Sequence, residues 1–197
     1  MKKIIIHIFL LWFLLLGTSA EAFMEGTNFY FFGFDIKSIT EDKHPFVIGL
    51  GAISSIDIHV VGHCLIGEIN NLDYTVHSFP PYETAINGSD NEYIQFALGG
   101  FALQHTGALL MTYFDNCRTG SSAWHSFTKG YVGACALETW SYPLRDTNDG
   151  DFYNINKQGG NGDLWWGIFS LLSIHEILRV NWGLVNDEYT SYCRRHS

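Results

Sequence analysis

Four long apolar segments follow an apolar N-terminal stretch, and polar connectors that contain glycine and proline separate them. The segments lack the strict alternation of apolar and polar positions that is typical of half-buried strands, and at 13 to 22 residues they have the length of helices. They span residues 46–67, 93–114, 130–142 and 164–178. The pattern therefore predicts an all-α protein built on a bundle of about four helices.

The N-terminus has the three parts of a secretory signal peptide. Two lysines follow the initiating methionine, residues 4–16 are apolar, and an Ala-x-Ala sequence ends at Ala22. The apolar stretch is short for a membrane span, which needs about 20 residues, so a retained anchor is the weaker alternative. We expect residues 1–22 to be a signal peptide and the protein to be exported.

Residues 23–197 are expected to form one helical domain with an aromatic-rich N-terminal lead and a polar C-terminal tail. The lead, residues 23–45, is interpreted as a short strand pair or an interfacial segment. The connectors are interpreted as loops because they are rich in glycine, asparagine and proline. They cover residues 70–91, 115–122 and 146–162. Asp163, which follows the last connector, is expected to cap the fourth helix.

The acidic balance of the chain narrows the class of partner. The net charge is −9 over the full sequence, and the chain without the leader has 9 basic and 19 acidic residues. We expect the protein not to bind nucleic acid, because neutralising phosphates requires a surplus of lysine and arginine. Binding to anionic lipid heads through a basic patch is disfavoured for the same reason. The sequence identifies no protein partner.

The apolar segments favour a membrane or cell-envelope location, with membrane lipids as partners. Two of them have 22 residues, enough to cross about 30 Å of hydrocarbon. Small residues recur four apart, as in Gly51 and Ser55, which lets helices approach closely in membranes. Against this, Asp57 interrupts the first segment and the loops have no basic excess. A periplasmic or secreted soluble domain is the alternative.

Four cysteines follow the leader, and an even number in an exported chain permits two disulfides. Cys117 and Cys193 lie in polar surroundings and are plausible partners. Cys64 and Cys135 lie in apolar segments, where they either pair across two helices or remain buried thiols.

Two histidines in the first segment carry the most informative chemistry. His59 and His63 are four residues apart, so on a helix they share one face and lie one turn from each other. This spacing allows two imidazoles to bind one metal ion. Asp57 is about 200° around the helix from His59 and cannot join the same chelate from there.

The stretch from His59 to His63 reads His-Val-Val-Gly-His. It resembles the HExGH helix of membrane-associated zinc metallopeptidases, and the resemblance extends over about residues 46–110. The glycine-rich stretch from Gly99 to Gln104 resembles the second helix of some relatives. The resemblance implies a zinc ion held by His59 and His63. It does not supply the glutamate that acts as general base in that family, because Val60 stands at its position.

A third ligand is expected from another helix, where isolated polar side chains interrupt apolar surroundings and are costly to bury unless paired or bound. His175 is the first choice. The other polar candidates are Asp57, Glu68, His105, Glu138 and Glu176.

Two other interpretations of the histidines stay open. They can be structural, each bonded to a carbonyl or carboxylate in a packed core, in an envelope or surface protein that acts through partners or lipids without catalysis. Haem held between histidines of facing helices is a further alternative.

Overall fold

A computed structural model of the chain describes residues 30–31, 34–35, 42–78, 81–117, 122–142 and 150–185. The described part is mostly helical, which confirms the predicted all-α class. The predicted leader, most of the aromatic lead and the polar tail from residue 186 lie outside the described residues. Two short strands within the lead, β1 (Tyr30–Phe31) and β2 (Phe34–Asp35), form an antiparallel pair, as one of the two interpretations expected.

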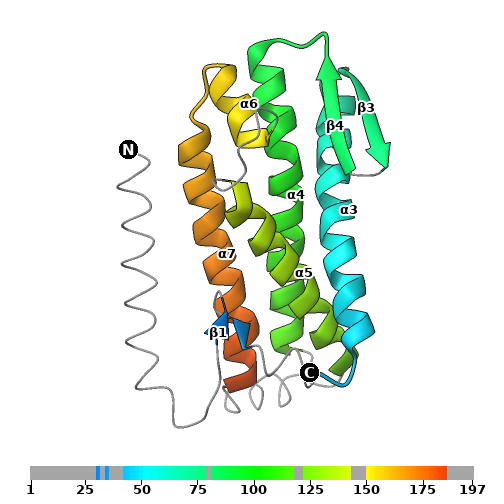
Figure 1. Cartoon of the computed structure of the whole chain (residues 1–197), viewed down its shortest axis with the longest axis vertical. Helices are drawn as coiled ribbons and strands as arrows, with labels where there is room; N and C mark the ends of the chain where they lie inside the picture. The colour runs from blue at the N-terminus through cyan, green and yellow to red at the C-terminus, as the bar shows by residue number, and fades with distance from the viewer. Residues whose placement is uncertain are drawn as a thin grey trace.

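Four long helices lie side by side and alternate in direction along the chain (Figure 1). Both α3 and α7 pack against α4 and α5, and we call these four helices together the helical body. Their bounds are α3 Pro45–Ile69, α4 Asp90–Cys117, α5 Ser122–Ser141 and α7 Gly162–Val185.

Helix α5 begins eight residues before the predicted segment, at the last residue of the 115–122 connector, and covers residues 123–129, for which no element was predicted. The reason is that its polar side chains point inward: Ser126, Thr128 and Lys129 are buried. The predicted cap of α7 is also wrong. Asp163 lies inside the first turn, and the side-chain oxygen of Asn161 accepts the bond from the backbone N–H of Leu164.

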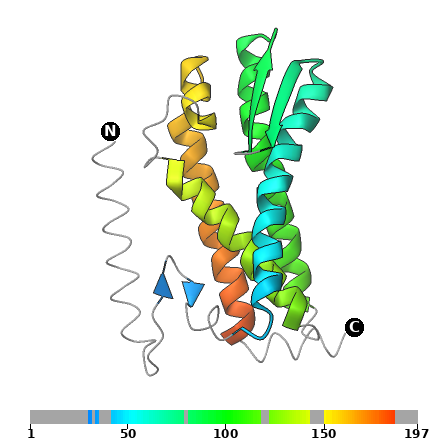
Figure 2. The ribbon, with the colours of Figure 1, turned by 45° about the vertical axis from the view of Figure 1, so that its right-hand side comes forward.

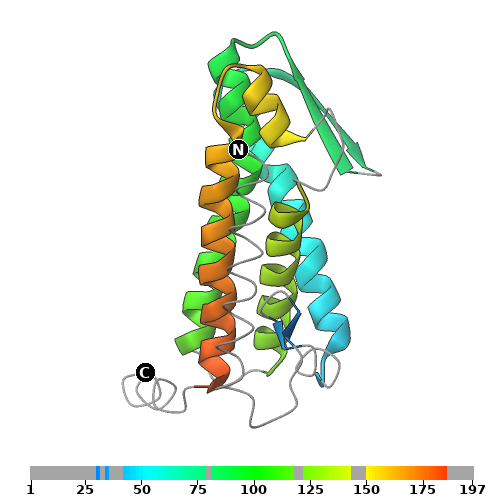
Figure 3. The ribbon, with the colours of Figure 1, turned by 60° about the vertical axis from the view of Figure 1, so that its left-hand side comes forward.

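Two connectors that were predicted as loops contain regular structure. Residues 70–91 include the antiparallel hairpin of β3 (Asp73–Ser78) and β4 (Pro81–Ile86), which contacts α3 (Figure 2). Residues 146–162 include the short helix α6 (Asp151–Lys157), which packs against α4 and α7. Figure 3 shows α6 and the hairpin at the same end of the helical body.

Glycines bring the backbones of neighbouring helices into contact. A Cβ atom on Gly62 of α3 would lie 2.3 Å from the carbonyl oxygen of Gly99 in α4. Nearer the N-terminal end of α3, a Cβ on Gly51 would lie 2.1 Å from the carbonyl oxygen of Phe127 in α5. Any larger side chain at these positions would push the helices apart, so the glycines set the spacing of α3 from both neighbours.

The interior of the helical body contains many polar side chains beside two apolar clusters, and its surface is mostly apolar. Buried polar or charged side chains come from all four helices; they include Ser55, His59, His63, Gln104, His105, Thr112, Ser126, Thr128, Thr139, Ser173 and Glu176. Most of the large exposed side chains on the same helices are apolar; they include Leu50, Ile53, Ile56, Val61, Leu65, Leu110, Leu137, Leu164, Ile168, Leu171 and Leu178. This surface differs from the polar outer face expected for a helical body in water.

A buried ion pair fixes the chain just before α3 to α5. The carboxylate of Asp42 accepts bonds from Ser126 Oγ at 2.6 Å and Lys129 Nζ at 3.1 Å, and from the backbone N–H of His44 at 2.8 Å. Burial alone would raise the pKa of Asp42, but these donors and the lysine charge lower it below its usual value.

The substitution Gly62→Val is expected to destabilise the protein by about 1–3 kcal/mol, because the added side chain overlaps the backbone of α4. The matched control is Gly49→Ala in the same helix, where a Cβ meets nothing within 4 Å. It should leave stability unchanged or raise it by up to about 1 kcal/mol. Unfolding of the purified variants by heat or denaturant measures both. Equal stabilities of the two variants would contradict the close approach of α3 and α4.

Candidate metal centre

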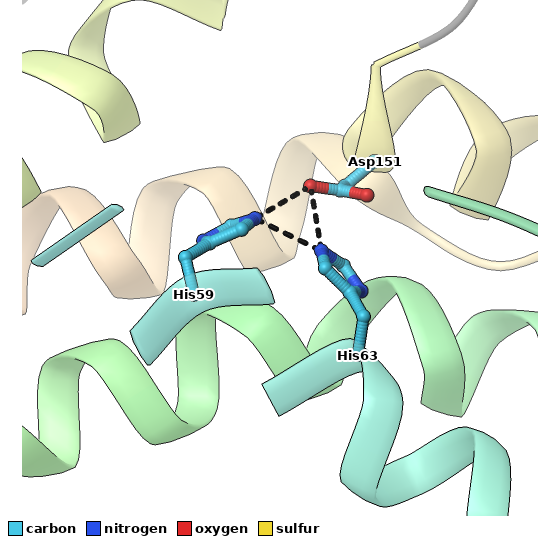
Figure 4. A group of neighbouring side chains, drawn as sticks. All are labelled: His59, His63 and Asp151. Atoms are coloured by element: carbon cyan, nitrogen blue, oxygen red, sulfur yellow. Dashed lines mark hydrogen bonds and ion pairs between the residues drawn. The ribbon is translucent and has the colours of Figure 1, made fainter. Parts of the chain in front are cut away.

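His59 and His63 lie one turn apart on the face of α3 that meets α4, as their spacing predicted. Both side chains are buried, with 5% and 1% of their surface exposed. Their rings point toward one another at a centroid distance of 4.7 Å (Figure 4).

The tautomer of His63 follows from its backbone partner. Its Nδ1 lies 2.7 Å from the carbonyl oxygen of Phe96, and a carbonyl can only accept a hydrogen bond. Nδ1 therefore carries the proton and donates it. In the neutral ring this leaves an unprotonated Nε2 with its lone pair directed away from α4's backbone.

The tautomer of His59 follows from the side-chain amide of Gln104. The amide nitrogen donates to Ser55 Oγ and to Glu138 Oε2, both at 2.9 Å, so the amide oxygen must face the other way. That oxygen lies 3.1 Å from His59 Nδ1 and accepts its proton. Neutral His59 therefore also has an unprotonated Nε2.

Both unprotonated nitrogens face the carboxylate of Asp151, the first residue of α6. The two Nε2 atoms are 2.9 Å apart, and Asp151 Oδ2 lies 3.3 Å from that of His59 and 3.6 Å from that of His63 (Figure 4). Three atoms that only accept hydrogen bonds thus converge on one point. Such an arrangement is stable only when a cation, either a proton or a metal ion, lies between them.

The carboxylate of Asp151 is oriented and kept ionised by its neighbours. The hydroxyl of Tyr142 donates to Oδ2 at 2.7 Å. Burial by itself would raise the pKa of Asp151, but the positive charge of His63 and His59, which the rings gain when a proton occupies Nε2, and the hydrogen bonds that this proton allows lower it well below its usual range. The group therefore supplies a negative charge to the centre.

The distances among the three atoms match a metal site. Ligand atoms at the usual zinc distances of about 2.0–2.1 Å stand roughly 3.3–3.4 Å apart in a tetrahedron. The observed separations of 2.9, 3.3 and 3.6 Å bracket this value. A zinc ion therefore requires shifts of only a few tenths of an ångström.

Gly100 of α4 keeps the space beside the imidazoles open. A Cβ at this position would lie 2.4 Å from His63 Nε2 and 2.7 Å from His59 Nε2. The Cβ of any residue other than glycine would fill the space next to the two Nε2 atoms, which an ion needs in order to bind them. The glycine-rich stretch noted in the sequence thus contributes Gly100 for space and Gln104 for orientation.

The structure does not bring His175 to this centre. Its side chain is exposed on α7, and Asp151 supplies the third ligand atom in the part of the chain that the structure describes. Asp151 lies in the connector that was predicted as a loop, where acidic residues are common, so nothing in the sequence distinguished it.

The other predicted polar candidates are spread over three places. Asp57 and Glu68 are exposed on α3, and Glu68 accepts a bond from the hydroxyl of Tyr74. Glu138 is half-buried and lies 4.0 Å from His59 Nδ1, on the side of the ring opposite Nε2. His105 and Glu176 meet in a separate cluster deeper in the helical body.

The structure also bears on the predicted cysteine pairs and on the haem alternative. Cys64 and Cys135 both carry thiols, so they do not pair with each other, while a pairing of Cys117 with Cys193 involves a residue outside the described ranges. His59 and His63 both lie on α3, whereas the haem alternative requires histidines of facing helices.

Comparisons with known proteins give no relative from which a role could be transferred. No protein-family model, curated protein or solved structure matches the chain. Among the described helices, α3 alone is both long and apolar enough by composition to cross a membrane.

The hydrogen bonds predict the same tautomer for both rings. Nitrogen-15 spectra of the histidine-labelled protein should show protonated Nδ1 atoms for His59 and His63. In a Gln104→Leu variant His59 should lose this preference while His63, held by a backbone carbonyl, keeps it. The control is Gln95→Leu, an exposed glutamine of the same helix. A protonated Nε2 and bare Nδ1 on either ring of the wild type would refute the arrangement.

Proposed function

We propose that the protein is a membrane-embedded metal-binding protein in which His59, His63 and Asp151 hold one divalent cation, with zinc as the first choice. The observation that carries the proposal is the convergence of two oriented imidazole nitrogens and a carboxylate oxygen on one point. Nitrogen and oxygen donors at tetrahedral spacing suit zinc.

The neighbours of the ligands support metal binding as well as the ligands do. Metal-bound histidines usually donate their second ring N–H to a carbonyl or carboxylate, which fixes the ring and its tautomer. His59 donates to the Gln104 amide oxygen and His63 to the Phe96 carbonyl. Asp151 in turn accepts a bond from Tyr142. Each ligand therefore has the supporting partner that metal sites have.

The surface of the helical body supports a membrane location. Its four helices have 20 to 28 residues, which corresponds to about 30–42 Å and suffices for the hydrocarbon core. Away from the first and last turns, Asp57 is the only formally charged residue among the exposed positions that the structure describes on these helices. So few charges on the exposed faces of four long helices are unusual for a soluble protein and favour surroundings of lipid.

The internal packing supports the same location. Backbone contact at small residues is how membrane helices associate, because lipid gives no hydrophobic force between them. Gly62 makes such a contact with α4 and Gly51 with α5. Many of the buried polar groups also find partners inside the body, among them Gln104, His105 and Glu176, which suits surroundings without water.

The resemblance to zinc metallopeptidases supports the metal but not peptide hydrolysis. Val60 has no proton to exchange where that family has its general base. Glu138, the nearest other carboxylate, approaches the Nδ1 side of His59 and so lies away from the point where the ligands converge. We therefore propose a role in holding the ion without proteolysis.

Metal analysis of the detergent-purified protein tests the proposed centre. Both Asp151→Asn and the double variant His59→Ala/His63→Ala should lose one equivalent of zinc relative to wild type, because three ligands are needed to hold the ion. His175→Ala removes an exposed imidazole and should keep the full amount. Gln104→Leu should weaken zinc binding about 10–100-fold, as loss of a supporting hydrogen bond does at other metal sites.

If wild-type protein saturated with zinc holds no more zinc than the ligand variants do, the metal proposal is wrong. Loss of stability in the double variant without any loss of metal would instead favour structural histidines in an envelope protein that acts through partners or lipids.

Extraction of membranes tests the proposed location. The protein should stay in the pellet after washing with alkaline carbonate and enter solution only with detergent. A protease site placed after Ala22 removes residues 1–22 before extraction, so a retained leader cannot account for the result. Recovery of the cleaved protein in the carbonate supernatant would show that the helical body is not embedded.

A further inference from the structure

A second cluster of metal-ligand side chains lies in the interior of the helical body, and we infer that it is a separate, sulfur-containing site for a thiophilic divalent cation such as zinc. Its members are His105 of α4, Cys135 of α5 and Glu176 of α7. All three side chains are fully buried or nearly so, with at most 1% of their surface exposed. The site is argued from its own geometry and does not depend on the centre at His59.

Burying three ionisable side chains together costs free energy unless another interaction offsets the loss of their hydration. An imidazole, a carboxyl group and a thiol meet beside a buried apolar cluster that includes Tyr131, Val132, Ala136 and Val180. Buried ionisable groups in apolar surroundings are stable when they pair with one another or bind a metal. Each of the three groups comes from a different helix, so only the packing of the whole helical body brings them together.

Hydrogen bonds again fix which ring nitrogen faces inward. The hydroxyl of Thr139 donates to the carbonyl oxygen of Cys135 at 3.0 Å, so its oxygen accepts from His105 Nε2, which lies 3.2 Å away. Nε2 therefore carries the ring proton, and Nδ1 of the neutral ring presents its lone pair to Glu176 Oε1 at 2.9 Å. Either a proton on the Glu176 carboxyl group or a metal ion therefore stands between these two atoms.

The third donor stands at the distance that a shared ion requires. Cys135 Sγ lies 3.6 Å from His105 Nδ1 and 3.7 Å from His105 Nε2, and 3.9 Å from Glu176 Oε2, the carboxyl oxygen that does not face Nδ1. With a Zn–S distance of about 2.3 Å and a Zn–N distance of about 2.0–2.1 Å, tetrahedral geometry places sulfur roughly 3.5–3.6 Å from the other ligands. The cluster is therefore close to the spacing of a site with nitrogen, oxygen and sulfur ligands.

The two sites are neighbours but differ in chemistry. The ring of Phe101 contacts His59 at 4.6 Å and His105 at 6.3 Å between centroids, so one aromatic side chain touches both clusters. The first centre offers two nitrogens and an oxygen; the second adds a thiol, which binds as thiolate after releasing its proton. Thiolate favours soft and borderline ions over magnesium or calcium.

Cobalt(II), added to the purified full-length protein as a probe for zinc, tests the second site. A thiolate ligand gives cobalt an intense sulfur-to-metal charge-transfer band in the near ultraviolet, which nitrogen and oxygen ligands do not produce. Wild-type protein should bind two equivalents and show this band. Cys135→Ser, which changes one atom, should lose the band and one equivalent of cobalt.

Two matched variants separate this site from other sources of the band and from the first centre. Cys64→Ser, which removes the thiol of α3, should keep the band. The double variant His59→Ala/His63→Ala should keep it while losing the other equivalent, so each site can fail without the other.

Cadmium-113 resonance of the wild type gives a readout that needs no variant. A cadmium ion bound to sulfur resonates at far higher frequency than one bound only to nitrogen and oxygen. Wild-type protein that shows neither the cobalt band nor a sulfur-bound cadmium signal would overturn the second site, as would a band that persists in Cys135→Ser.

Discussion

Two imidazole nitrogens and a carboxylate oxygen face one another inside the helical body, and this arrangement requires a positive charge between them. Much of the surrounding structure serves that contact. Backbone contact between α3 and α4 at Gly62 brings α4 close enough for Gln104 to orient His59 and for the Phe96 carbonyl to orient His63. Gly100 leaves the space that the contact needs. A proton satisfies the charge requirement in part, whereas a metal ion satisfies all three acceptors at once.

The apolar segments of the sequence predicted the all-α class because helices surrounded by apolar contacts on most sides leave long apolar runs. The same criterion failed where polar residues point inward. The first turns of α5 were missed because they contain the polar residues Ser126, Thr128 and Lys129, which are buried in the structure. The hairpin of β3 and β4 was missed because its connector is rich in proline, asparagine and glycine, which usually indicate a loop.

The candidate centre was predictable in the part that one helix supplies. Spacing alone placed His59 and His63 on one face, since helical geometry fixes the relation of residues four apart. The third ligand comes from a distant segment, and only the tertiary structure brings Asp151 to the pair. His175 was predicted instead because it is a polar residue within an apolar segment. In the structure it lies on the exposed face of α7.

The most direct test of the central claim is a diffraction experiment at the zinc absorption edge on crystals of the protein grown with zinc. An anomalous peak should lie within about 2.0–2.2 Å of His59 Nε2, His63 Nε2 and Asp151 Oδ2. The Nδ1 atoms should still face Gln104 and the Phe96 carbonyl. The same rings without a peak between them, in crystals saturated with zinc, would show that a proton alone holds the three acceptors together.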